Sequence, residues 1–277
     1  MTLTVFAVLL FAALLHATWN AIVKASPDKL LAAIALNGFA ALIAVAALPF
    51  SPQPAAASFP YLGASCLIQA IYCVLLAKTY QVSDMSQTYP IMRGTAPLIV
   101  AIVGATFLGE SLTLSAAAGI AVICCSILLM AITRHTRPGK GVWMALLNAG
   151  MIAAYTLIDG TGVRLSGTAL GYTLWTFLLN GLCLWLWALS FQRQRMVHYA
   201  VKYWPQGLAG GVGTLLSYGL ALWAMTQAPL AVVAALRETS ILFGALIAVV
   251  VLKETATRQR LFAAIGIALG AIILRLA

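Results

Sequence analysis

Two stretches of this chain, Thr88-Tyr-Pro-Ile-Met-Arg-Gly-Thr95 and Ala234-Ala-Leu-Arg-Glu-Thr239, each place an arginine inside a long apolar run. Arg93 and Arg237 are 144 residues apart, and the same offset relates Glu110 to Glu254 further along each run. Identical residues also recur at this offset between those anchors: Thr95/Thr239, Leu98/Leu242, Ala101/Ala245 and Leu108/Leu252. Two unrelated apolar helices are not expected to share so many positions, so the sequence predicts a tandem duplication.

The composition places the chain in a membrane. Hydrophobic residues make up 63% of the sequence and charged residues 8%, which leaves too little polar surface to cover a water-soluble core. A helix needs about 20 apolar residues to cross the hydrocarbon layer of a bilayer. Ten such stretches are predicted, at residues 3–23, 30–49, 60–80, 86–108, 112–132, 142–159, 168–190, 205–226, 230–252 and 260–275. We therefore predict an all-α integral membrane protein with ten transmembrane helices.

The basic segment 134–141, which contains Pro138 and Gly139, is the one connector with the composition of a linker. It separates a first five-helix repeat at residues 1–133 from a second repeat at residues 142–277. Because five is an odd number, the second repeat must enter the membrane in the opposite sense, so the two repeats are predicted to be inverted. The first helices of the two halves correspond only weakly, at an offset of 136 that aligns Trp19 with Tyr155 and Asn20 with Thr156.

The net charge of +10 has a topological explanation, because basic residues gather in the loops on one side of the predicted membrane. That side holds Lys24, Lys29, Lys78, Arg134, Arg137, Lys140, Arg193, Arg195, Lys202, Lys253, Arg258 and Arg260, and the other side holds only Arg164 and Arg275. By the positive-inside rule the first side is cytoplasmic, so both termini are predicted to be outside. A basic patch that binds polyanions is the less favoured alternative, and no nucleic-acid partner is predicted.

No metal or cofactor site is predicted. The five cysteines, Cys66, Cys73, Cys124, Cys125 and Cys183, fall inside predicted spans and have no His or Cys partner at a metal-ligand spacing. We expect them to be reduced and to pack as small apolar groups.

The ten-helix duplication, together with Leu108-Gly-Glu-Ser-Leu112 and Leu252-Lys-Glu-Thr-Ala256 and the glycine-containing apolar helix after each, resembles the EamA-like branch of the drug/metabolite transporter superfamily. The resemblance covers nearly the whole chain. It implies a metabolite transporter, with export of a small metabolite or amino acid as the leading expectation, in the inner (plasma) membrane of a bacterium. Many members of the branch that this chain resembles have basic residues between helices 2 and 3, whereas this chain has Ser51-Pro-Gln-Pro-Ala55 there. Its orientation is therefore predicted from its own charged residues and not from the resemblance.

Arg93 and Arg237 are the first candidates for substrate binding or gating. A charged side chain inside a membrane costs about 2.5–3.5 kcal/mol on insertion scales and is usually offset by a partner or a wet cavity. With a rise of about 1.5 Å per residue, Arg93 is expected roughly 10 Å deep, and Arg237 equally deep from the other side. Pro97 also frees the carbonyl of Arg93. Two interpretations stay open: a cavity wall that meets a polar or anionic substrate group, and a packing kink in which Arg93 binds a nearby carbonyl.

Glu238 follows Arg237 directly, and their side chains diverge by about 100° on a helix, so the two cannot both face lipid. Glu238 is the sequence-based candidate for a proton or cation site. The alternative is an internal ion pair with Arg93 or Lys24.

Polar side chains line one face of two further helices. His16 and Asn20 are four residues apart on the first helix with Trp19 beside them, and Asn148, Tyr155 and Asp159 follow spacings of seven and four on the sixth. We expect both faces to point into the bundle. His16 has two interpretations, a hydrogen-bonded packing residue or a proton relay. Asp159 lies at the end of the predicted helix, where a solvated or capping carboxylate is expected.

An aromatic wall for an amine or a ring is predicted from residues deep in the spans, namely Tyr72, Tyr89, Trp175, Tyr218 and Trp223. Tyr89 is the strongest of these, because it lies one helical turn from Arg93. The alternative is that they are interfacial or packing aromatics.

The sequence has no nucleophile with an adjacent base and no nucleotide-binding glycine loop, which argues against an enzyme or an ATP-driven pump. We predict a secondary transporter in which two inverted five-helix bundles rock around a cavity lined by helices 1, 3, 4, 6, 8 and 9, with a proton as the candidate coupling ion. Its partners are the bilayer and a small polar or zwitterionic substrate. A monomer is expected, with a dimer as the alternative. An uptake permease or facilitator, and a non-transporting membrane assembly or scaffold protein, also remain open.

Overall fold

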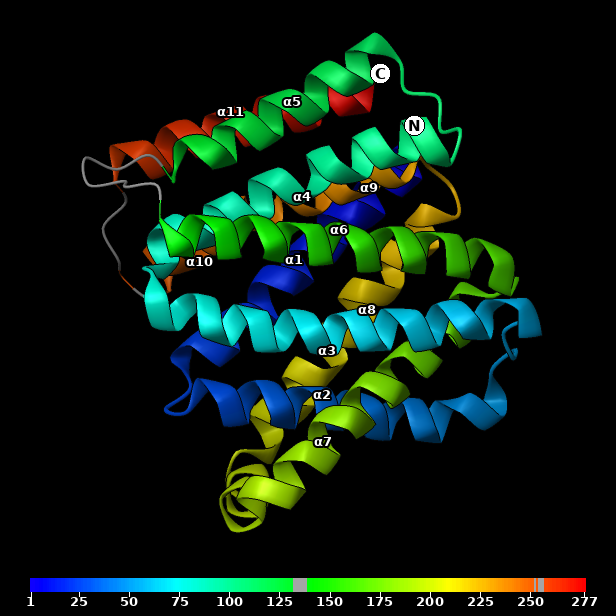
Figure 1. Ribbon diagram of the computed structural model, residues 1–277, viewed down its shortest axis with the longest axis vertical. Coiled ribbons are helices and arrows are strands. Elements are labelled where there is room, and N and C mark those ends of the chain that lie inside the picture. Colours follow the sequence, from blue (N-terminus) through cyan, green and yellow to red (C-terminus); the bar gives the residue numbers. More distant parts are fainter. Residues whose placement is uncertain (132–138, 252, 254–256) are drawn as a thin grey trace.

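The computed structural model describes residues 1–131, 139–251, 253 and 257–277 (Figure 1). Over these residues the chain forms helices and connections, without a β-strand. The helices are α1 (Leu3–Ala25), α2 (Lys29–Ala47), η1 (Leu48–Phe50), η2 (Ala56–Ser58), α3 (Phe59–Val82), α4 (Met85–Phe107), α5 (Leu114–Leu129), α6 (Lys140–Ser166), α7 (Ala169–Lys202), α8 (Trp204–Met225), α9 (Leu230–Arg237), α10 (Ser240–Val250) and α11 (Arg258–Leu276). Most of the predicted linker, residues 134–138, and Glu254 lie outside the described residues.

The predicted all-α membrane fold is confirmed. Within the described residues, nine helical segments are long and apolar enough to cross a membrane, with α9 and α10 together forming one of them, Leu230–Val250. The remaining predicted span, residues 112–132, corresponds to the shorter apolar helix α5. Large apolar side chains such as Phe107, Leu114 and Phe262 are exposed, as expected of surfaces that face lipid tails.

Most of the helices run side by side, and both termini lie at the same end of the bundle, on the right in Figure 1. We call this end the terminus end. It also contains the connections at residues 48–58, 108–113, 167–168 and 226–229. We call the opposite end, which holds the connections at residues 26–28 and 83–84, the linker end.

The packing of the helices has an internal symmetry. The most extensive contacts join α2 to α7, α5 to α11, α3 to α6, α1 to α8 and α4 to α6, and α1 also packs against α9 and α10. Exchanging each helix for its counterpart five spans later turns the α3–α6 contact into the α8–α1 contact, and the α4–α6 contact into that of α9 and α10 with α1. The contacts of α2 with α7 and of α5 with α11 map onto themselves. A two-fold axis between inverted repeats produces this pattern.

The two sequence halves are nevertheless interleaved in space. Helix α6 packs against α3 and α4 of the first half, and α1 packs against α8, α9 and α10 of the second. The two five-helix halves are therefore in extensive contact through α1 and α6.

A backbone detail supports the offset of 144 residues. Gly109, just after α4, has φ 65°, and Lys253, at the aligned position after α10, has φ 57°. The N–H of Glu110 donates to the carbonyl of Gly104 at 3.0 Å, a bond typical of a helix that ends in a left-handed residue. A lysine adopts this conformation at a cost that glycine does not have. The two copies thus share an unusual turn at the same position.

Three helix boundaries differ from the prediction. Helix α6 continues to Ser166, past Gly160 and Gly162. A Cβ atom added to Gly160 or Gly162 would lie 2.5 Å from a side-chain atom of Leu230 or 2.4 Å from one of Tyr172, respectively, so these glycines permit close packing of the neighbouring helices. Helix α7 continues to Lys202 past a kink at Gln192. The ninth span is broken into α9 and α10.

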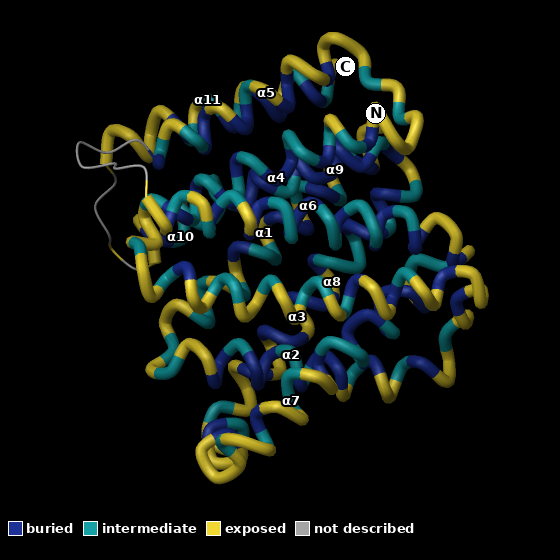
Figure 2. Tube along the Cα trace, viewed as in Figure 1, coloured by how far each residue is buried: buried dark blue, intermediate teal, exposed yellow. Residues whose placement is uncertain are grey.

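Burial separates the central helices from the peripheral ones. Every residue of α9 from Leu230 to Leu236 is buried, whereas α5 and α11 expose much of their outer faces (Figure 2). Helix α9 contacts α4, α1, α5, α8 and α6. The segment that carries Arg237 and Glu238 therefore lies at the centre of the bundle.

Candidate functional site

The two arginines reach the centre of the bundle from different helices. Arg93 projects from α4, and its Nε lies 2.8 Å from Oε2 of Glu238, the residue that ends α9. The two side chains are 12% and 6% exposed. Of the two interpretations of Glu238, the structure places it in the ion pair with Arg93. The attraction between the two opposite charges offsets part of the free-energy cost of burying them.

Arg237 has a different environment. Its guanidinium carbon lies 5.0 Å from the centroid of the Tyr218 ring, a distance at which the face of the ring attracts a cation. No carboxylate among the described residues forms an ion pair with Arg237. Because a guanidinium carries five N–H donors, Arg237 is the cation of this region best able to bind an added anionic group.

The backbone is weakened beside both arginines. Helix α9 stops at Arg237, and the N–H groups of Glu238 and Thr239 donate to carbonyls three residues back rather than four. In α4, Pro97 has no N–H to donate to the carbonyl of Arg93. Interrupted helices within a membrane are tolerated where they face protein or a water-filled cavity, and they often form the binding sites of transporters.

A small cavity brings the predicted residues together. It is lined by Arg93, Ala96, Pro97 and Val100 of α4, by Ile152, Tyr155 and Thr156 of α6, and by Ala234, Arg237 and Glu238 at the end of α9. Both arginines, the glutamate and Tyr155 therefore share one site, which we call the arginine cavity. The lining combines cationic guanidinium groups and an anionic carboxylate with mostly apolar side chains. Such a lining suits a small molecule that carries both charges.

Two other predicted tyrosines border the arginine cavity. The rings of Tyr72 and Tyr155 meet edge to face with centroids 6.1 Å apart. Tyr89, Tyr72 and Tyr155 all pack against a buried cluster that contains Met92 and Ala96. Tyr218 lies on the other side, under Arg237.

The predicted residues of α1 do not line the arginine cavity. His16 and Trp19 stack edge to face at 4.9 Å, and the amide of Asn20 donates to the carbonyl of His16 at 2.8 Å. Asn20 is exposed. The ring contact of His16 and the hydrogen bond of Asn20 are therefore both made within α1.

Asn148 and Trp175 also lie outside the arginine cavity. The fully buried amide of Asn148 donates to Oγ1 of Thr79 at 2.8 Å, which ties α6 to α3. The indole of Trp175 donates to the Gln53 amide oxygen at 2.9 Å, beside the ring of Phe59 at the terminus end. Both contacts connect helices to their neighbours.

Asp159 was wrongly expected to be solvated. Because α6 continues to Ser166, Asp159 lies within the helix and is completely buried. The Tyr172 hydroxyl donates to its Oδ1 at 3.0 Å, and the Tyr218 hydroxyl donates to its Oδ2. The amide of Gln69 approaches Oδ2 at 3.5 Å. The spacing of Asn148, Tyr155 and Asp159 already indicated an inward face; placing the end of the helix too early hid the result.

A further network closes the terminus end. Arg164 binds Oε1 of Glu110 at 2.8 Å and donates to the carbonyls of Met225 and Ala228 at 2.8 and 3.0 Å. The N–H of Leu230, at the start of α9, donates to both oxygens of Glu110 at 3.0 and 2.9 Å. A carboxylate is favoured at a helix N-terminus. We call these contacts the terminus clasp. From the sequence, Arg164 was expected only as a charged residue of a loop.

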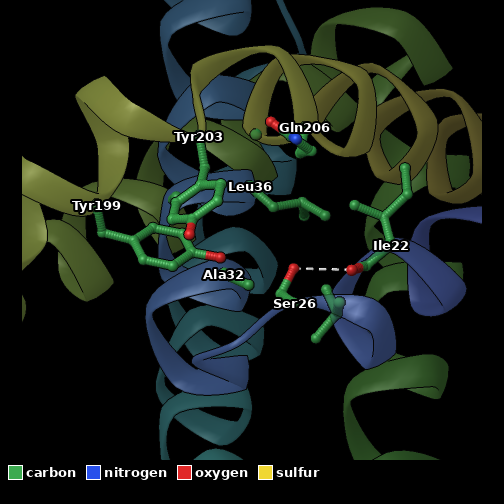
Figure 3. Close-up of a pocket in the computed structure, with 10 residues that line it drawn as sticks. Ile22, Ser26, Ala32, Leu36, Tyr199, Tyr203 and Gln206 are labelled. Atoms are coloured by element: carbon green, nitrogen blue, oxygen red, sulfur yellow. Dashed lines mark hydrogen bonds between the residues drawn. The ribbon is translucent and has the colours of Figure 1, made fainter.

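A second small cavity lies at the linker end, between the end of α1, α2, α7 and the start of α8 (Figure 3). Tyr199, Tyr203 and Gln206 line it, and the hydroxyl of Ser26 donates to the carbonyl of Ile22 at 2.8 Å. No charged side chain is among the residues that line this cavity, in contrast to the arginine cavity. Among the described residues, no group of three His, Cys, Asp or Glu side chains is arranged to hold a metal ion.

Comparisons with known proteins agree with this architecture. In the part of the chain that the structure describes, the nine long apolar helical segments and the shorter α5 define a helical integral membrane protein. Residues 139–276 match the EamA-like transporter family, and the chain belongs to that family, which is one of transporters of the drug/metabolite type rather than enzymes. A solved structure titled "Crystal structure of protein" has a TM-score of 0.74 and 16% sequence identity, over 100% of this chain and 98% of that one, which shows the shared fold. A search of curated proteins found no match by sequence.

Proposed function

We propose that this chain is a secondary transporter that exports a small zwitterionic metabolite, an amino acid or a related polar compound, by alternating access. The observation that carries the proposal is the arginine cavity: two arginines and a glutamate from interrupted helices face one small space at the centre of a membrane bundle. A structural ion pair alone would need one arginine. The second arginine is the group that a substrate would meet.

The charges of the cavity suit a zwitterion. The substrate carboxylate binds the guanidinium of Arg237, which has no ion-pair partner among the described residues. The substrate ammonium group faces the Glu238 carboxylate and the ring of Tyr155, both of which line the same cavity. A molecule that carries both charges leaves the membrane interior neutral, so it costs less to bury than a single ion.

Alternating access requires contacts at one end to break while those at the other end form. The terminus clasp joins α6 to the end of α8 and to α9, and the Tyr218 hydroxyl joins α8 to Asp159 of α6. In our proposal these contacts close the outward path, and substrate reaches the arginine cavity from the linker end. The basic residues on that side make it the cytoplasmic side, with both termini outside, in a bacterial inner membrane.

The test is a thermal-unfolding screen of the purified protein against amino acids, aminophosphonates, organic acids and quaternary amines. A ligand that binds the native state raises its unfolding temperature. We expect zwitterions to stabilise the wild type, and Arg237→Ala to abolish that stabilisation. Arg193→Ala is the matched control, because it removes an exposed arginine outside the cavity and should leave the ligand response intact.

Retention of the full ligand response in Arg237→Ala would make the arginine structural and would overturn this site. A ligand found by the screen is then loaded into proteoliposomes to measure flux. Exit that runs against a substrate gradient supports secondary active export. Flux that only follows the substrate gradient identifies a facilitator instead, and binding without flux contradicts transport.

A further inference from the structure

Asp159 differs from the other acidic residues that the structure describes. Three of those carboxylates form ion pairs: Asp28 with Arg195, Glu110 with Arg164, and Glu238 with Arg93. Asp84 is exposed in front of α4. Asp159 alone among them is completely buried and has no Lys or Arg within ion-pair distance. A lone charge in a membrane interior is expensive and usually functional.

The neighbours of Asp159 are neutral hydrogen-bond donors from three helices. Tyr172 of α7 donates to one carboxylate oxygen, and Tyr218 of α8 donates to the other. Gln69 of α3 approaches the second oxygen, and the amide oxygen of Gln69 in turn accepts a hydrogen bond from Asn180 of α7 at 3.0 Å. A carboxylate can be stabilised in this way without a cation, because each donor brings partial positive charge.

The titratable and charged groups around Asp159 come from several helices packed against α6. From α3 they include Tyr72, whose ring meets that of Tyr155, and Cys66, whose sulfur lies 3.7 Å from that of Cys183 on α7. Within α6 the titratable neighbour is Tyr155, one turn away, and from α4 and the end of α9 the charged groups are Arg93 and Glu238, which neutralise each other. The charge that acts on Asp159 through a direct neighbour is therefore Arg237, by way of the Tyr218 ring. η2 (Ala56–Ser58) brings no titratable group.

We propose that Asp159 is the proton-binding residue of the transport cycle, in place of Glu238. The inference rests on the proposed function and names its coupling ion. Glu238 forms an ion pair with Arg93, so giving it a proton would leave a buried guanidinium without a charged partner. Asp159 has no such partner to lose. Its protonation removes a net buried charge.

Protonation of Asp159 changes the contact between α6 and α8. In the ionised state the Tyr218 hydroxyl donates its single hydrogen to Oδ2. When a proton binds to Oδ2, that oxygen becomes a donor, and the Tyr218 hydroxyl can turn to accept its hydrogen. This hydroxyl belongs to the ring that contacts the Arg237 guanidinium. A proton at Asp159 and a carboxylate at Arg237 are thereby linked through one side chain, as coupled transport requires.

The test is infrared difference spectroscopy of the protein in lipid as the pH is lowered, which needs no substrate. A carboxyl group that takes up a proton gains a C=O stretching band that shifts in heavy water. We expect the band of the buried carboxyl to disappear in Asp159→Asn and to persist in Glu238→Gln, the matched change at the other buried acid. Tyr218→Phe removes one donor to the ionised carboxylate, so the band should appear at a higher pH than in the wild type.

Loss of the band in Glu238→Gln with retention in Asp159→Asn would overturn the proposal. An unchanged titration in Tyr218→Phe would also overturn it, and this variant keeps the test decisive if Asp159→Asn fails to fold. Because the readout is independent of flux, the proton site can fail while the ligand screen succeeds. The reverse result, a titrating Asp159 in a protein without any ligand response, would contradict the transport proposal instead.

Discussion

The two copies of the repeated segment place an arginine at the same position but give it different partners. Arg93, in the first copy, forms a buried ion pair with Glu238 of the second. Arg237, in the second copy, rests on Tyr218, whose hydroxyl binds the unpaired Asp159. The difference follows from one position: Glu238 in the second copy aligns with Gly94 in the first. Duplication supplied two cations and a single acid beside them, which makes one arginine structural and leaves the other available.

The largest expected effect on the free energy of unfolding is at Arg93. Arg93→Ala leaves Glu238 buried without its cation, and we expect the free energy of unfolding to fall by about 3–5 kcal/mol. Reversible unfolding in mixed detergent measures the change. The double variant Arg93→Ala/Glu238→Ala should lose less than the sum of the single variants. Strict additivity would mean that the ion pair contributes no coupling.

The next effect is at Tyr218. Tyr218→Phe keeps the ring under Arg237 but removes a hydrogen bond to a charged group, which we expect to cost about 1.5–3 kcal/mol. The same unfolding measurement applies. Tyr80→Phe is the control, because Tyr80 packs at the edge of the cluster around Met92 and is not among the hydrogen-bond donors to Asp159. An equal cost in both variants would argue that the Asp159 contact contributes nothing specific.

Arg237→Ala should affect stability less and binding more. Its cation–π contact with Tyr218 is worth about 1 kcal/mol, since the side chain is only half-buried. Comparing unfolding temperatures with and without ligand separates the two roles. A stability loss as large as that of Arg93→Ala would show that the two arginines are equivalent after all.

The smallest expected effect on stability is at the turn that follows α4 in the first copy and α10 in the second. Lys253 holds φ 57° where the other copy has Gly109. Lys253→Gly removes a left-handed penalty of about 1 kcal/mol, and the greater freedom of glycine in the unfolded chain offsets part of this gain. We expect a net stabilisation of about 0.5 kcal/mol, measured by thermal unfolding. The reciprocal Gly109→Ala should destabilise, and a gain there would show that the turns are not equivalent.

Much of the fold and part of the site could be predicted. Apolar length predicted the nine spans of membrane-crossing length and the shorter α5, and the offset of 144 identified Arg93 and Arg237 as a pair. The sequence predicted the two arginines at similar depths from opposite sides, and the structure places both in the lining of the arginine cavity. The prediction failed where a residue's role depends on neighbours from other helices. The sixth span was predicted to end at residue 159, but α6 continues to Ser166, and Gly160 and Gly162 within it allow Leu230 and Tyr172 to approach. Ending this helix too early led to the expectation of a solvated or capping Asp159.

The amino-acid sequence by itself determined the membrane class, the approximate positions of the apolar spans, the duplicated arginines and the charge asymmetry of the loops, because these depend on composition and spacing along one chain. Only the tertiary structure decided that α1 and α6 pack against helices of the opposite half, that Glu238 binds Arg93, and that Asp159 is buried with Tyr172 and Tyr218 as its hydrogen-bond donors. The physical reason is that helix tilt and rotation are set by packing against neighbours, and hydropathy carries no information on either.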